Sequence, residues 1–161
     1  MGKSNTKRIY VSHKQLLRSI PEKVFPLLCP TKEYDWIETW ECDLIYSKSG
    51  LAEKDCIFIT APSGSERMVW VVDEYEMNKH IQFVIYTTTH IIRYKISLSD
   101  KKDNTTEALW EQTITALNDE GNNYVDNFSI NNYQAMIERL ERMINYYLET
   151  GRMLKEKKEE I

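Results

Sequence analysis

Three side chains on two stretches of sequence have the chemistry to recognise a small molecule. In the stretch 105–117, Trp110 and Gln112 alternate with polar residues, and in 90–98 Tyr94 alternates in the same way with charged residues. Successive residues of a strand point to opposite faces, so this alternation places all three on an apolar inner face. A buried amide needs hydrogen-bond partners. Gln112 would therefore bond to a ligand carbonyl or hydroxyl, or else to Tyr94 or the backbone.

The titratable side chains do not form a recognisable catalytic set. His13, His80 and His90 are far apart in the sequence, and none has the spacing of a metal ligand, so we expect no metal and no cofactor. His90 begins a strand and could act as a general base, although a structural or surface role is the favoured interpretation. Glu107 and Glu111 share a polar strand face, which favours solvent exposure over acid–base catalysis.

Acidic and aromatic residues gather in the segment that follows the first short helix. Glu33, Asp35 and Glu38 flank Trp36, and Trp40 follows. The three carboxylates either guard a pocket entrance or form a solvated helix face, and the second interpretation is favoured. The two tryptophans are expected either to anchor the core or to stand at the pocket mouth.

The elements that must position these residues follow from periodicity and turn signals. A first strand is expected at 8–18, and Ser19 and Glu22 then have the spacing of a capping box for a short helix. Thr31 can cap a second short helical turn. The strands expected after these two short helices are 42–47, 55–61, 66–75, 81–88, 90–98 and 105–117, separated by turn signals at 49–50, 62–64, 77–79 and 100–104. Such short connections favour pairing of successive strands in an antiparallel meander.

The remainder, 120–156, has apolar residues at helical spacing and predicts one helix about 50 Å long at 1.5 Å per residue. A helix of this length must lie across the sheet, and a strongly curved sheet leaves space beneath it that one helix cannot fill. That space is the expected pocket. The residues expected to line it are Trp70, Tyr94, Trp110, Gln112, Ile114, Tyr133, Met136, Leu140 and Met143.

Composition sets limits on the class of protein. The chain has 161 residues, which predicts a single α+β domain with a fraying charged end at 155–161. Its formal net charge of -4 argues against a nucleic-acid partner. Three cysteines without paired spacing favour a reducing cytoplasm. No apolar stretch is long enough for a membrane span, and we expect a monomer or a weak dimer.

Several motifs resemble one superfamily. They are 20–28 (IPEKVFPLL), 30–37 (PTKEYDWI) continuing to 40–43 (WECD), and 109–113 (LWEQT). They resemble the START-like, or SRPBCC, superfamily, which joins START lipid-transfer domains, the birch-pollen-allergen fold and polyketide cyclases. The segment 30–43 is most similar to an uncharacterised prokaryotic branch, although Thr39 stands where that branch has glycine.

The resemblance implies a helix-grip fold, in which about seven antiparallel strands wrap around a long C-terminal helix after two short helices. It also implies a hydrophobic cavity under that helix. The leading hypothesis is a binding, transport or sensing protein for a hydrophobic or amphipathic small molecule, including a lipid. The alternatives are an enzyme of the polyketide cyclase or dehydratase kind and an interaction protein of the co-chaperone-activator kind. The superfamily shares no catalytic residue set, so the resemblance assigns no catalytic residue.

Overall fold

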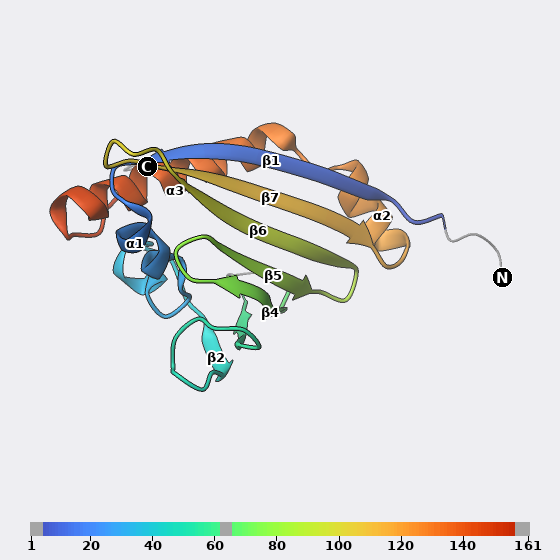
Figure 1. Ribbon diagram of the computed structural model, residues 1–161. Helices are drawn as coiled ribbons and strands as arrows, with labels where there is room; N and C mark the ends of the chain where they lie inside the picture. The colour runs from blue at the N-terminus through green and yellow to red at the C-terminus, as the bar shows by residue number, and fades with distance from the viewer. Residues whose placement is uncertain (1–4, 62–65, 157–161) are drawn as a thin grey trace.

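One curved antiparallel sheet organises the chain (Figure 1). The computed structural model describes residues 5–61 and 66–156, so the predicted turn at 62–64 and the last part of the charged tail, 157–161, lie outside the described residues. The strands are β1 (Arg8–Leu17), β2 (Asp43–Tyr46), β3 (Ile57–Thr60), β4 (Met68–Glu76), β5 (His80–Tyr86), β6 (His90–Asp100) and β7 (Thr106–Ala116). The predicted helix-grip architecture is confirmed.

The strand order is β1-β7-β6-β5-β4-β3-β2, so the predicted meander from β2 to β7 is present. The first strand is the exception, because it pairs with the last strand rather than the second. The connection from β1 to β2 therefore has to cross from one edge of the sheet to the other. It carries α1 (Pro21–Val24) and the two short 3-10 helices η1 (Phe25–Leu28) and η2 (Glu33–Asp35), which cover one end of the sheet (Figure 1).

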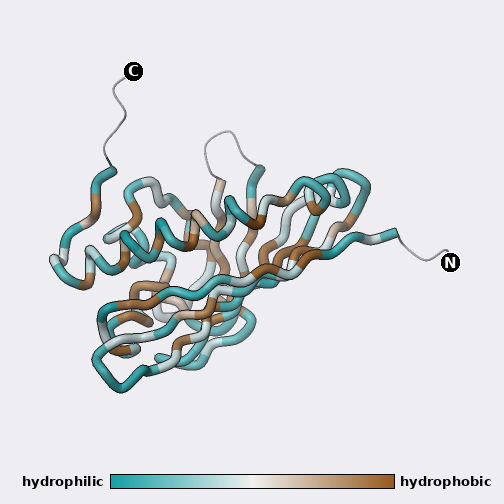
Figure 2. Tube along the Cα trace, turned by 90° about the horizontal axis from the view of Figure 1, so that it is seen from above, coloured by the Kyte–Doolittle hydropathy of each residue, from teal (hydrophilic) through white to brown (hydrophobic). Residues whose placement is uncertain are grey.

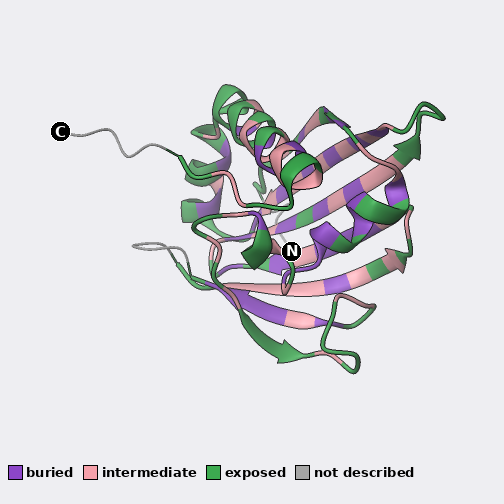
Figure 3. Cartoon of the chain, turned by 90° about the vertical axis from the view of Figure 1, so that its left-hand side faces the viewer, coloured by how far each residue is buried: buried purple, intermediate pink, exposed green. Residues whose placement is uncertain are grey.

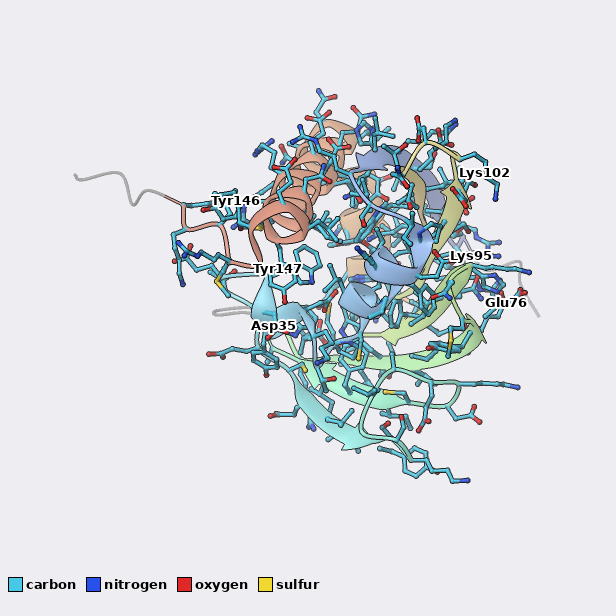
Figure 4. All side chains as sticks on the ribbon, turned by 60° about the vertical axis from the view of Figure 1, so that its left-hand side comes forward. Asp35, Glu76, Lys95, Lys102, Tyr146 and Tyr147 are labelled. Atoms are coloured by element: carbon cyan, nitrogen blue, oxygen red, sulfur yellow. The ribbon has the colours of Figure 1, made fainter. Side chains whose placement is uncertain are left out.

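Period-two alternation sets which residues face the interior. Along β7, buried and half-buried residues alternate without interruption, and β6 shows the same pattern over most of its length (Figure 3). The register places Tyr94 beside Gln112 and Ile96 beside Trp110. The aromatic and amide groups identified from the sequence are thus on one concave face. The polar positions between them face outward, where Figure 4 shows Lys95.

The predicted helix caps are wrong in detail. Helix α1 begins at Pro21 with Ile20 at its N-cap and no side-chain capping bond, so Ser19 and Glu22 form no capping box. Proline needs no N–H acceptor and its φ angle is already helical, which explains why this helix starts without a cap. Thr31 does not cap η2 either, because its hydroxyl contacts the Cys29 sulfur at 3.1 Å.

The predicted single helix over 120–156 is two helices, α2 (Asp119–Asp126) and α3 (Ile130–Thr150). The Ser129 hydroxyl accepts a hydrogen bond from the Asn132 N–H at 3.1 Å and so caps a new helix. Gly151 ends α3 in the left-handed conformation with φ of 67°. The break lets α2 pack against the end of β7 while α3 takes its own direction.

Helix α3 lies over the β1 edge of the sheet. The Gln15 amide donates to the Ile137 carbonyl at 2.8 Å. The Asn145 side chain accepts from the Arg18 N–H at 2.8 Å and donates to the Leu16 carbonyl at 3.0 Å. The two Asn145 bonds satisfy backbone groups at the end of β1, an edge strand whose other neighbour is β7, and the Gln15 bond ties the same strand to α3. Among the strands, α3 makes its main contacts with β1, and Figure 2 shows the helix beside this strand.

Gly121 allows α2 to approach the β5–β6 turn. A Cβ atom at this position would stand 2.0 Å from the Thr89 carbonyl oxygen, which is a backbone atom that cannot rotate away. Gly121→Ala is therefore expected to lower the free energy of unfolding by about 2 kcal/mol, although alanine normally favours a helix. Urea denaturation measures this loss. Glu120→Ala, at the exposed neighbouring position, serves as the control, and an equal effect of both changes would contradict the close approach.

Candidate ligand-binding cavity

A cavity of about 930 Å³ lies between the concave face of the sheet, the two C-terminal helices and the segment that follows η2. It exists because α3 packs at the β1 edge and leaves the middle strands uncovered. Its walls come from β3 to β7 on one side and from α2 and α3 on the other. Its volume is within the usual range for small-molecule sites.

The sheet side of the cavity is an almost continuous aromatic surface, which we call the aromatic wall. It consists of Trp40, Phe58, Trp70, Phe83, Tyr94 and Trp110. Successive ring centroids along this series are 6.4, 5.2, 5.5, 6.3 and 5.8 Å apart. After Trp40, each ring comes from the next strand of the sheet, so the wall crosses five strands. Edge-to-face and stacked contacts at these distances hold the rings in place without any ligand.

The structure brings most of the predicted pocket residues together. The cavity lining includes Trp70, Tyr94, Trp110, Gln112, Tyr133, Met136 and Leu140, and of the two predicted mouth residues it includes Trp40. Ile114, Met143 and Trp36 are fully or almost fully buried but do not line it. The Trp36 indole donates to the Leu27 carbonyl at 2.8 Å, so this residue anchors the core beneath η1.

The sequence did not single out several lining residues on the sheet, in the segment after η2 and around the two C-terminal helices. Phe58 and Phe83 are inward positions of β3 and β5, which alternation alone could have found. Ile37 belongs to the segment after η2. The remaining additions are Met68, Ile85, Thr89, Ile92, Ile96, Glu120, Asn123, Tyr124, Asn127, Phe128, Ser129, Asn132 and Arg139. Many of them surround the break between α2 and α3, which a continuous helix would not have placed there.

Gln112 and Tyr94 form the polar group of the aromatic wall. Gln112 lies directly opposite Tyr94 in the register of β6 and β7, and both side chains line the cavity. Burial, with smaller contributions from Tyr133 and Glu33, raises the pKa of Tyr94 well above its ordinary value. The phenol therefore stays protonated and can donate a hydrogen bond into the cavity.

Gln15 positions the end of the aromatic wall and was not anticipated from the sequence. It is 2% exposed, and its amide oxygen accepts from the Trp110 indole at 2.8 Å while its nitrogen bonds to α3. The Tyr133 hydroxyl donates to the Trp110 carbonyl at 3.0 Å. The sequence does contain a signal for this role, because Gln15 is a polar residue on the same inward face of β1 as the apolar Val11 and Leu17.

Glu33 carries a carboxyl group that lines the cavity. Burial raises its pKa from 4.5 to about 8. Asp35 and Glu38 are exposed, so only one of the three acids predicted at the entrance reaches the cavity. Figure 4 shows Asp35 at the same end of the molecule as Tyr147 near the end of α3.

The chain beyond α3 returns across this end of the molecule. Arg139 lines the cavity and binds Glu156 through two nitrogens, at 2.6 and 3.2 Å. The Glu156 N–H donates to the Glu38 carboxylate at 3.2 Å, and Lys155 lies 3.9 Å from the same carboxylate. These contacts join the end of the described chain to the segment after η2.

The other candidate acid–base residues lie outside the cavity lining. His90 is stacked on Tyr124 at 4.0 Å and its Nδ1 contacts the hydroxyls of Thr87 and Thr89. Burial lowers the pKa of His90. Its role in these contacts is structural, which was the favoured interpretation.

The paired carboxylates of β7 face outward. Glu107 lies 3.4 Å from Lys14, and Glu111 accepts from the Tyr10 hydroxyl at 2.7 Å. Within residues 5–61 and 66–156, no group of three or more acidic, histidine or cysteine side chains could hold a metal ion. No helix in the same described ranges has the length and apolar character to cross a bilayer.

No family model matches the chain, and no curated protein matches it. Several solved structures do match the chain. Norcoclaurine synthase from Thalictrum flavum, solved in complex with dopamine and hydroxybenzaldehyde, is 10% identical with a TM-score of 0.66, and the match covers 98% of this chain and 96% of that protein. Ara h 8.0201 is 10% identical with a TM-score of 0.61, over 89% of this chain and 99% of that one.

DynU16, from the dynemicin biosynthetic locus, is 12% identical with a TM-score of 0.63 over 89% of this chain. The present chain spans only 48% of DynU16, about half of its length. These likenesses confirm, at the level of the fold, the resemblance expected from the motifs. The chain is a helix-grip protein whose sheet, α2 and α3 enclose an aromatic cavity.

Proposed function

We propose that this protein binds a hydrophobic or amphipathic small molecule in the cavity. The observation that carries the proposal is the aromatic wall, which presents rings from five adjacent strands to an open space. An apolar surface of this kind is costly to leave in water, at roughly 25 cal/mol per Å². A ligand that covers it recovers part of this free energy, less the cost of its own immobilisation.

Polar groups at defined places would orient such a ligand. Tyr94 and Gln112 line the β6–β7 side of the cavity, and Asn123, Asn127 and Asn132 line the α2–α3 side. A few polar groups among apolar ones are typical of sites that bind one class of molecule. An amphipathic ligand with its apolar body against the wall matches this distribution better than a uniformly apolar one.

Binding of a neutral solvatochromic dye such as Nile red tests the proposal. Ile85 and Ile92 are paired across β5 and β6 and both line the cavity. Changing both to tryptophan fills part of the space, and we expect the dye affinity to fall by about tenfold. Val84 and Arg93 are paired in the same way on the opposite face, so Val84→Trp with Arg93→Trp is the matched control. Equal affinity for the two double variants would contradict binding in the cavity.

A catalytic role of the cyclase or dehydratase kind is the second candidate. It is favoured by one specific feature, a carboxyl that is largely protonated at neutral pH, Glu33, in the same cavity as the Tyr94 phenol. Both groups could donate protons to a bound carbonyl compound. Turnover of a polyketide-like or aromatic substrate that is lost in Tyr94→Phe while substrate binding persists would establish it.

We also propose a cytoplasmic setting. Cys29, Cys42 and Cys56 are all free thiols, which is the state that a reducing compartment maintains. Burial raises the pKa values of Cys42 and Cys56, so these two are poor nucleophiles. Thiol counting on protein freshly isolated from its own cells checks this setting, and a disulfide-linked form would contradict it.

A further inference from the structure

The Glu33 carboxyl is the feature of the cavity that binding of an apolar ligand does not explain. It lines a space walled by aromatic rings, and burial raises its pKa. Among residues 5–61 and 66–156, no side chain donates a hydrogen bond or forms an ion pair to this carboxyl. The Glu33 side chain is half-buried and lines the cavity, so a ligand in the cavity can supply the partner that the described protein groups do not.

The other charged and titratable groups around the cavity do not serve as that partner. Arg139 is bound to Glu156 through two nitrogens. Glu120 is also an acid, so it cannot compensate the charge of the Glu33 carboxylate. Tyr94 and Cys42 carry no positive charge; burial raises the pKa of each, and Glu33 adds a smaller contribution.

We propose that the ligand of this cavity carries a positively charged amine, which pairs with Glu33 and lies against the aromatic wall. This inference depends on the proposed function, because it names the chemical class of the ligand in the same cavity. Ile37 and Trp40 follow Glu33 in the chain and line the same cavity, and the ring of Trp40 contacts that of Phe58. Aromatic faces attract cations within about 6 Å, so the wall and the carboxylate act on the same charge.

Binding of such a ligand also has a distinct proton balance. Glu33 is mostly protonated at neutral pH in the empty protein, because its pKa is about 8. An adjacent cation favours the carboxylate, so Glu33 releases its proton to solvent as the cation binds. A neutral ligand of the same shape causes no such release.

The test uses two probes of nearly the same shape, benzyltrimethylammonium and neopentylbenzene, in which carbon replaces the charged nitrogen. Both are measured by displacement of a neutral dye from the full chain. We expect the cation to bind the unaltered protein about tenfold more tightly than the neutral probe. We expect Glu33→Gln to remove this preference without weakening the neutral probe. Asp35→Asn removes a carboxylate from the same turn outside the cavity and should preserve the preference.

Calorimetry of the cation at about pH 6.5, in two buffers with different ionisation enthalpies, should detect proton release that is absent in Glu33→Gln. Equal affinities of the two probes for the unaltered protein would overturn the amine proposal and leave the proposed function intact. A preference for the cation that persists in Glu33→Gln would also overturn the amine proposal and leave the proposed function intact. Failure of the dye and of both probes to bind would overturn the proposed function itself, and the amine proposal with it.

Discussion

Replacing Trp110 by alanine is expected to lower the free energy of unfolding by about 4 kcal/mol, the range measured for buried aromatic residues. Trp110 is 3% exposed and its ring lies 5.8 Å from that of Tyr94. Its removal also leaves the Gln15 amide oxygen without its indole donor in a buried position. Urea denaturation measures the loss directly.

A double-mutant cycle separates the hydrogen bond from the packing. Gln15→Leu alone leaves the indole N–H of Trp110 unpaired, whereas Trp110→Phe alone leaves the amide oxygen of Gln15 unpaired. Each should therefore be destabilising, and the double variant should lose less than the sum by about 1 kcal/mol or more. Strict additivity would show that Gln15 does not hold Trp110. A loss below about 1.5 kcal/mol for Trp110→Ala would show that the ring is not packed in the core.

The second large effect is the pH dependence that Glu33 imposes on stability. Its pKa is about 8 in the folded protein and its ordinary value is 4.5. Between these values the folded chain holds a proton that the unfolded chain has lost. Its contribution to the free energy of unfolding therefore falls as the pH rises from 4.5 to about 8, and stays constant above that.

The isosteric variant Glu33→Gln lacks this dependence. It should be more stable than the unaltered protein above pH 8, and the difference should vanish near pH 4.5. The upper limit of the difference is about 5 kcal/mol, because each pH unit between the two pKa values corresponds to about 1.4 kcal/mol, and solvent contact of the half-buried Glu33 side chain lowers it. Thermal or urea denaturation across this range measures it. A stability difference between the two proteins that does not change with pH would show that the Glu33 carboxyl is solvated rather than buried in the cavity.

The sequence predicted the features of this fold that depend on local patterning. Alternation in β6 and β7 placed Tyr94, Trp110 and Gln112 on the concave face, and turn signals separated the strands of the meander. These features follow from one strand at a time. They need no information about which distant residues meet.

The features that the sequence did not predict depend on tertiary contacts. Apolar spacing continues through 127–129, so the end of α2 and the new cap at Ser129 were not distinguishable from a continuous helix. Gln15 gained its role only because β1 pairs with β7 and brings it to Trp110. Glu33 is one of three acids close together in the sequence, and only it lines the cavity. Which of the three does so depends on how this segment packs in the folded chain.

The central claim, that the cavity is the binding site, is tested most directly by the indole N–H signals of the four tryptophans in a nitrogen-15 NMR titration with a small naphthalene-based probe. Trp40, Trp70 and Trp110 line the cavity, whereas Trp36 is fully buried in the core and does not. We predict that the first three signals shift in a saturable way while that of Trp36 stays in place. Saturable binding that leaves the three cavity signals unmoved would contradict the account.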